Sequence, residues 1–319
     1  MENLKVDLNI DKELFTPLSE EEKNFEQVVR PSVGFWADAW RRLKTNKLAI
    51  VSLIAIGIIF ILAFLGPILM EKIMGYTYYA TDLNATNLRP SAEHWFGTDN
   101  LGRDLFVRVM YGARYSLIIA ISAAAINLVI GVLYGGIAGF FGGKVDNIMM
   151  RIVDVLYSIP TQIYVIILMA ALKKEGSTGL VTIILAMAIS YWVGMARIVR
   201  GDILQLKQQE FVLAAKTLGA SKTRILFKHL IPNCMGSILV TLTLFVPQAI
   251  FTEAFLSFIG LGINPPLASL GTLANDASGL LSTDAYQLIF PAAAICVIIL
   301  AFNLLGDGLT EALDPKNKR

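Results

Sequence analysis

Residues 48–69 read LAIVSLIAIGIIFILAFLGPIL and contain no charged side chain. A helix needs about 20 apolar residues to cross the hydrocarbon core of a bilayer, so this stretch predicts a membrane span. The same pattern recurs further along the chain, at 115–141, 152–172, 180–196, 235–258 and 285–306. The span at 152–172 is the least regular, because Asp154, Pro160 and Gln162 interrupt it. The sequence therefore predicts an all-α membrane protein with six transmembrane helices.

The composition also indicates lipid as the surrounding solvent. Charged residues make up 16% of the chain, whereas soluble domains carry about 25%. Basic and acidic residues number 27 and 25, and this balance gives no support for nucleic-acid binding. Cys234 and Cys296 fall at different predicted depths, so we expect free thiols. Residues 1–30 have no apolar core, so we expect no cleavable signal peptide.

The distribution of Lys and Arg predicts the orientation of the chain in the membrane. Seven of them lie in the loop at 197–232, whereas the loop at 259–284 has none. The first of these loops is therefore expected in the cytoplasm and the second outside. With six spans, both the N-terminus and the C-terminus are then cytoplasmic.

Two segments precede the first span. Ser19 followed by Glu22 has the spacing of a capping box, which predicts a short acidic helix. Residues 35–43 place aromatic and apolar side chains at helical spacing among basic residues. This pattern fits an interfacial helix on the inner leaflet or a plain juxtamembrane tether.

Small residues recur every fourth position in the second span. Gly131, Gly135, Gly139 and Gly143 form a stripe that Ala123 and Asn127 continue towards the start of the helix. Small residues at this spacing let two helix backbones approach closely in lipid. We therefore expect tight packing against a neighbour, in this chain or in a partner.

No catalytic or metal site is expected. The two histidines, His94 and His229, fall on opposite sides of the predicted membrane. Glu93, Asp99 and Asp104 lie near His94 and could hold a cation, but acids in such a loop more often form salt bridges. The candidate partners for these acids are Arg103 and Arg108.

A nucleotide site is not expected either. Gly142, Gly143 and Lys144 resemble the end of a phosphate-binding loop. Ala138 stands where its first glycine is needed, and Val145 replaces the Ser or Thr that holds magnesium. We therefore expect no ATP to bind to this chain.

An ion-coupled carrier needs ionisable groups near the middle of the membrane. Asp154 is expected near the inner end of its span and Glu253 near the outer end of its span, and the middles of the six predicted helices have no acid or base. We expect Asp154 to pair with Arg151 on the same helical face. The spans thus favour a passive pathway, with energy supplied from outside this chain.

The cytoplasmic loop has the pattern of two short helices with a break between them. Gly219 can adopt the left-handed conformation that ends a helix, and Ser221 can cap the next one. Ile225, Leu226 and Leu230 form an apolar face on the second helix. The pattern fits either a compact knob for a groove on a partner protein or an amphipathic loop lying on the inner leaflet.

The same loop resembles the EAA loop of bacterial ABC importer permeases, in which a coupling helix docks on the ATPase subunit. The matching residues are Ala214, Ala215, Gly219, Ile231 and Pro232, whereas Leu213 stands where the general motif has Glu. The resemblance implies a set of ATPase-coupling residues: Glu210, Ala214, Ala215, Leu218, Gly219, Ala220, Ser221 and Pro232.

Two external segments narrow the resemblance. Residues 94–104 read HWFGTDNLGRD and residues 253–262 read EAFLSFIGLG. Both are similar to segments of the oligopeptide, dipeptide and nickel permease family, in its second, C-type subunit. The resemblance covers roughly residues 35–315.

The resemblance implies the type I ABC importer permease fold in a bacterial cell membrane. The expected regions are an acidic cytoplasmic tail at 1–34, an interfacial helix, first span and external loop at 35–111, a five-helix permease core at 112–306 and a cytoplasmic tail at 307–319.

The resemblance also implies partners in the lipid bilayer and around it. These are a homologous second permease, two ABC ATPases that carry ATP and Mg, an external substrate-binding protein and a peptide substrate, with no cofactor in this chain. Nickel, glutathione, haem or another small solute are the alternatives within the family. An ion-coupled carrier or a membrane receptor or enzyme is the alternative outside it.

Overall fold

The computed structural model describes residues 34–172 and 178–313, and it contains helices and no strand within these ranges. Five helices are long and apolar enough to cross a membrane. They are α3 (Lys47–Met74), α4 (Leu105–Phe141), α7 (Leu180–Leu206), α11 (Met235–Phe258) and α13 (Tyr286–Leu313). All but α11 begin or end beyond the apolar segments predicted from the sequence, because polar turns extend them at one or both ends.

The third predicted span is bent. Helices α5 (Gly143–Tyr157) and α6 (Thr161–Leu172) meet at 86° across a short break. Pro160 lies in the break, where it can neither donate a backbone hydrogen bond nor continue a straight helix. The expectation of one helix over 152–172 is therefore wrong, and the chain has six spans if this pair is counted as one.

The chain divides into two units, one before and one after the boundary between Ala39 and Trp40. Of the first unit only residues 34–39 are described, and they form the start of α2 (Phe35–Thr45), the helix expected near 35–43. The predicted capping box of Ser19 and Glu22 lies outside the described residues. The position of α2 at the membrane interface stays a prediction.

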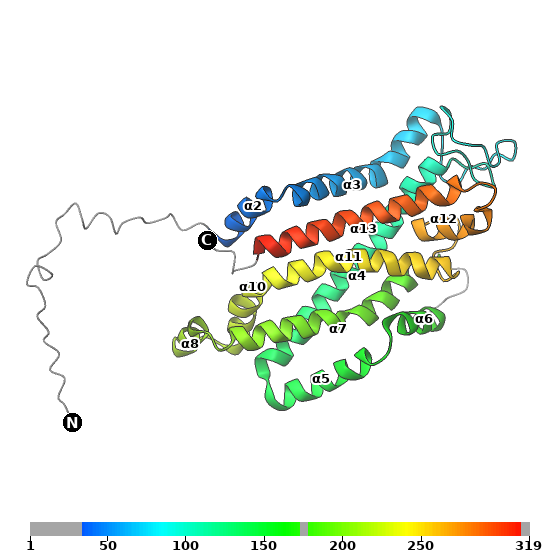
Figure 1. Ribbon diagram of the computed structural model, residues 1–319. Helices are drawn as coiled ribbons and strands as arrows, with labels where there is room; N and C mark the ends of the chain where they lie inside the picture. Colours follow the sequence, from blue (N-terminus) through cyan, green and yellow to red (C-terminus); the bar gives the residue numbers. More distant parts are fainter. Residues whose placement is uncertain (1–33, 173–177, 314–319) are drawn as a thin grey trace, which may run out of the picture. The chain divides into compact units, whose positions relative to one another are not determined.

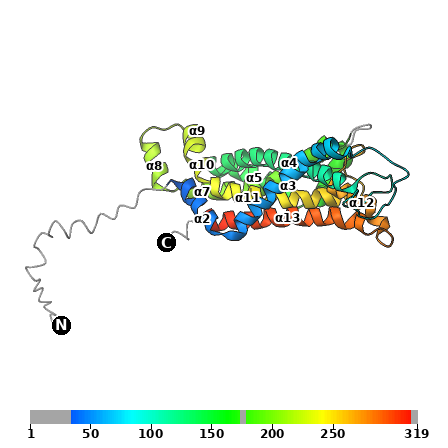
Figure 2. The same ribbon diagram turned by 90° about the horizontal axis from the view of Figure 1, so that it is seen from above.

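Successive spans of the second unit run in alternate directions. Figure 1 and Figure 2 show the start of α3, the end of α13 and the segment from α8 (Glu210–Thr217) to α10 (Ile231–Asn233) at one end of the bundle, called the hairpin end below. Here Asn46 Nδ2 donates to Glu311 Oε2 at 2.8 Å. At the opposite end, called the loop end, Tyr286 of α13 donates its hydroxyl to the Thr98 carbonyl at 3.0 Å. The predicted placement of the helix termini relative to the basic loop is thus confirmed.

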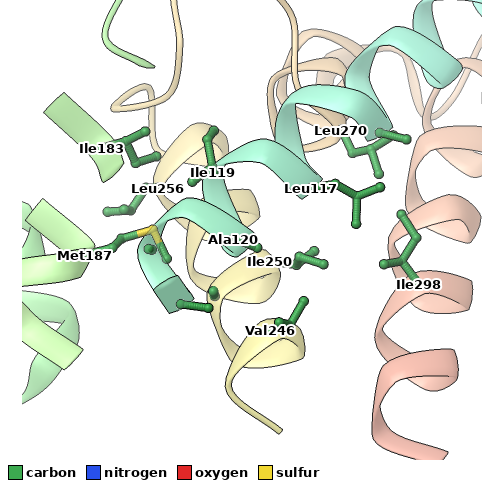
Figure 3. Packing of buried hydrophobic residues seen from close by; sticks show 14 of the residues in the cluster. Leu117, Ile119, Ala120, Ile183, Met187, Val246, Ile250, Leu256, Leu270 and Ile298 are labelled. Atoms are coloured by element: carbon green, nitrogen blue, oxygen red, sulfur yellow. The ribbon is translucent and has the colours of Figure 1, made fainter. Parts of the chain in front are cut away.

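The core of the bundle forms around α4 (Figure 3). Buried apolar side chains of α4 meet those of α7, α11, α13 and the short helix α12 (Leu270–Ala277), and they include Leu117, Ile119, Ala120, Ile183, Met187, Val246, Ile250, Leu256, Leu270 and Ile298. Lipid tails are as apolar as these side chains, so packing and hydrogen bonds hold the spans together.

The glycines of α4 let its backbone approach α7. A Cβ atom on Gly135 would overlap the Ala196 carbonyl oxygen, and one on Gly139 would lie 2.9 Å from the Arg200 carbonyl oxygen. A Cβ atom on Gly131 would likewise be too close to its neighbour, which is the Met195 side chain. Gly143, expected to continue this contact, begins α5, and no atom lies within 4 Å of a Cβ added to it. The close backbone contact therefore ends before Gly143, where α4 has ended and α5 begins.

Asp99 holds the loop end together. It accepts hydrogen bonds from the Leu101 and Arg103 backbone N–H groups, and its carboxylate pairs with the Arg103 and Arg108 side chains. Burial alone would raise the pKa of Asp99, but the Arg108 charge and these donors hold that pKa below its usual range. The expected pairing of the acids in this loop with Arg103 and Arg108 is confirmed at Asp99.

A buried carboxyl group links three helices near the loop end. Glu253 of α11 is fully buried and accepts hydrogen bonds from the hydroxyls of Ser116 in α4, at 2.8 Å, and Ser257, at 2.7 Å. Ser116 Oγ also accepts from the backbone N–H of Leu270 at the start of α12, at 3.2 Å. Hydroxyl donors thus satisfy this carboxyl group without a basic partner.

We predict that Gly135→Ala destabilises the protein whereas Gly136→Ala does not. The added methyl at 135 overlaps backbone, so the helices must separate, and overpacking of this kind costs about 1–3 kcal/mol. A methyl at 136 would lie 3.6 Å from the Leu226 side chain, an ordinary contact. Thermal unfolding of the two variants in detergent measures the difference. Equal midpoints would show that the α4–α7 contact does not limit stability.

Candidate functional site

The segment 207–234 at the hairpin end, called the hairpin below, projects from the bundle between α7 and α11 (Figure 1). Its base is fixed to α4. Lys207 Nζ donates to the Gly139 carbonyl at 3.2 Å and to the Phe140 carbonyl at 3.0 Å, the last turn of that helix. A cation at a helix C-terminus also interacts favourably with the helix dipole. The hairpin is therefore anchored where α4 and α7 come together.

The first arm of the hairpin is α8, and it ends in a Schellman turn. The backbone N–H of Ala220 donates to the Ala215 carbonyl and that of Gly219 to the Lys216 carbonyl, both at 3.0 Å. Gly219 has a φ of +79°, which an L side chain rarely adopts. The sequence prediction of a helix end at Gly219 is confirmed.

The second arm contains α9 (Lys222–Arg224), a π-helical turn (Ile225–Leu230) and α10. Ser221 caps it, since its hydroxyl oxygen accepts from the Arg224 backbone N–H at 3.3 Å. Pro232 has no N–H for the carbonyl four residues earlier. The preceding turn is wider accordingly, and the N–H of Ile231 donates to the carbonyl of Leu226, five residues back.

A small apolar core of its own packs the hairpin onto the bundle. Val212 and Ala215 of the first arm meet the second arm and the inner half of α7. The core comprises Met195, Val199, Ile203, Val212, Ala215, Ile225, Leu226, Leu230, Cys234 and Ile238. Burial, reinforced by the Asp202 charge, raises the pKa of the Cys234 thiol to about 12. The hairpin is thus a packed element rather than a loose loop.

The outer surface of the hairpin exposes large apolar side chains. Leu218 is 88% exposed and Leu213 is 65% exposed, and Phe211 and Phe227 are also exposed. Exposed apolar clusters on a rigid element mark surfaces that bind a partner. Of this set only Leu218 was predicted from the sequence, although the spacing of Phe211 and Leu213 on either side of buried Val212 was a signal for two of the others.

The structure divides the other predicted coupling residues between surface and core. Ala220 is half-buried in the turn and Ala215 is buried inside the hairpin. The remaining ones are exposed on the outer surface, and they are Glu210, Ala214, Gly219, Ser221 and Pro232.

Two ion pairs connect α5 to α7 just before the hairpin. Arg200 forms a bidentate pair with Asp146, at 2.6 and 2.7 Å, and Arg197 pairs with Asp154 at 2.6 Å. The expected Asp154–Arg151 pair is therefore wrong, because α7 brings a better-placed guanidinium from a distant part of the chain. Bidentate contacts of this kind also fix the relative orientation of two helices.

Comparison with known proteins identifies the family of this helical membrane protein. Residues 131–319 match the family described as the binding-protein-dependent transport system inner membrane component. The chain belongs to this family. Residues 34–90 of this permease also match the N-terminal TM domain of oligopeptide transport permease C. It is thus a multi-pass permease subunit of the cell membrane.

Individual relatives align over almost the whole permease. It is 51% identical over 311 residues to the oligopeptide transport system permease protein OppC of Bacillus subtilis (strain 168), covering 98% of this chain and 99% of the relative. The dipeptide transport system permease protein DppC of the same strain is 50% identical over 311 residues, with 97% and 95% covered. OppC of Escherichia coli (strain K12) is 40% identical over 303 residues, with 94% and 98% covered.

Cys234 can report the packing of the hairpin. In a Cys296→Ser background it is the only thiol of the chain. We predict that Val212→Ser speeds maleimide labelling of Cys234 by about tenfold or more, because loss of a buried aliphatic side chain costs more than about 1.4 kcal/mol. Leu213→Ser, one residue along on the exposed face, is the control and should label as slowly as the parent. Equal labelling of all three proteins would contradict the packed hairpin.

Proposed function

We propose that this permease is one of the two membrane subunits of an ATP-driven importer of peptides. The observation that carries the proposal is the rigid hairpin with an exposed apolar face, in a chain whose relatives are named oligopeptide and dipeptide permeases. A passive membrane subunit needs a site where mechanical work enters, and this surface has the chemistry of such a site.

The proposed partner of the hairpin is an ABC ATPase subunit. Leu218 and Leu213 supply apolar area, and the small Ala214 and Gly219 let a partner backbone approach closely. Since α7 runs without interruption from the bundle into the base of the hairpin, a displacement of the hairpin moves α7 directly. The ion pairs with Asp146 and Asp154 would carry that displacement on to α5.

The complete importer then has four kinds of component. A homologous second permease forms the other half of the path, two ATPases bind ATP and Mg, and an external substrate-binding protein delivers the peptide. The hairpin, the start of α3 and the end of α13 lie on the cytoplasmic side in this proposal, in line with the seven basic residues at 197–232.

Transport by the reconstituted complex tests the proposal. We predict that the permease pair with its ATPases, in proteoliposomes containing ATP, accumulates labelled trialanine when the binding protein is supplied outside. Vesicles with a non-hydrolysable ATP analogue are the control and should accumulate none. If the complex hydrolyses ATP and takes up nickel, glutathione or haem but no peptide, that solute replaces peptide as the proposed substrate.

Substitution of Gly219 tests the role of the hairpin. We predict that Gly219→Leu lowers both ATPase co-purification and uptake by about tenfold, because an L side chain in the left-handed conformation costs about 1–2 kcal/mol. Gly219→Asn is the matched control, since asparagine tolerates this conformation and no atom lies within 4 Å of the added Cβ. If the Gly219→Leu variant assembles with the ATPases and takes up peptide normally, the hairpin has no role in coupling.

A further inference from the structure

A cavity of about 300 Å³ lies among α4, the α5–α6 break, α7 and α11. Its lining includes Asn127, Gly194 and Gln248, which fall near the middle of α4, α7 and α11 respectively. The cavity therefore lies within the membrane-spanning part of the bundle. Its volume is enough for roughly ten waters at about 30 Å³ each, or for part of a bound solute.

The wall of this cavity combines apolar and polar side chains, and none of the residues that line it is charged. Seven residues of the wall carry hydroxyl or amide groups, and they are Asn127, Tyr157, Thr161, Ser190, Tyr191, Thr241 and Gln248. Polar groups facing lipid at this depth are costly, so groups gathered there indicate a space occupied by water or a polar solute.

Asn127 has an unsatisfied acceptor at this wall. The residue is 2% exposed, and its Oδ1 atom has no hydrogen-bond partner within the described part of the chain. A buried carbonyl oxygen without a donor is uncommon, because an unmade hydrogen bond at a buried site costs about 1–3 kcal/mol. A donor that enters the cavity, such as an N–H group, would satisfy it.

Arg197, which precedes the lining residue Ile198 in α7, is already paired. Arg197 pairs with Asp154 at 2.6 Å, and its guanidinium lies over the ring of Tyr157, with Cζ 4.1 Å from the centroid. An anion or cation entering the cavity would thus find no unpaired charge of the opposite sign among these groups. A solute with neutral donors and acceptors fits the wall better.

We propose that this cavity is the part of the translocation path in this chain that binds the peptide backbone, with Asn127 accepting from a backbone N–H of the passing peptide. This assignment rests on the proposed function. The peptide group is a neutral donor and acceptor common to every peptide, so such a wall accepts peptides whatever their side-chain charge. Few and uncharged contacts also keep binding weak enough for release, as a conduction path requires.

Gly194 offers a way to fill the cavity without disturbing the fold. It lies at the cavity wall, and no atom lies within 4 Å of a Cβ added to it. A leucine there would project into open space. Gly57 in α3 also has open space around its Cβ position and does not line the cavity, so Gly57→Leu is the matched control.

Uptake by the assembled importer in proteoliposomes tests the assignment. The probes are labelled trialanine, Ala-Glu-Ala and Ala-Lys-Ala, supplied with the binding protein, and co-purification of the ATPases confirms that each variant is folded. Gly194→Leu and Asn127→Leu should each lower uptake by about tenfold, and by the same factor within about twofold for all three peptides. Gly57→Leu should import at the parent rate.

Other outcomes overturn the assignment in distinguishable ways. Parent-level uptake in both cavity variants would mean that Asn127 holds only water and that the path lies elsewhere, with the proposed function intact. A loss confined to one charged peptide would mean that the cavity recognises side chains rather than backbone. A parent complex that imports none of the three peptides would overturn the proposed function itself.

Discussion

The close contact between α4 and α7 is the constraint on which the rest of this permease depends. Gly135 and Gly139 leave no room for a side chain between the two backbones, so the helices pack through main-chain atoms. Main-chain contacts are stiffer than contacts between long side chains, which can change rotamer. The two helices therefore form a rigid pair at the hairpin end.

Several features are arranged around this pair. Lys207 caps α4 and so sets the origin of the hairpin, and Arg197 and Arg200 hold α5 against α7. Towards the membrane centre the glycines give way to Asn127, and Gly194 on α7 leaves a space in front of it. The residue at each fourth position of α4 thus decides where this helix packs closely against α7 and where it borders a cavity.

Polar groups at depth are satisfied by neighbours from other helices at the loop end, and Asn127 differs from them in this respect. Glu253 is held by hydroxyls of Ser116 and Ser257, and Asp99 by Arg108 and backbone N–H groups. The Ser116–Glu253 contact joins α4 to α11 and the Asp99–Arg108 pair joins the loop to α4, whereas Ser257 lies on the same helix as Glu253. These contacts stabilise the loop end, whereas the Oδ1 atom of Asn127 at the cavity has no partner within the described residues.

The sequence by itself determined the membrane class, the order of the spans and the turn at Gly219, because apolar run length, charge and helix-ending residues act locally. Tertiary structure alone decided the partner of Asp154, the loss of Gly143 from the packing stripe and the burial of Ala215 within the hairpin. It also created the central cavity, whose walls come from four separate segments. Each of these depends on which distant helix lies alongside, and no local pattern of residues carries that information.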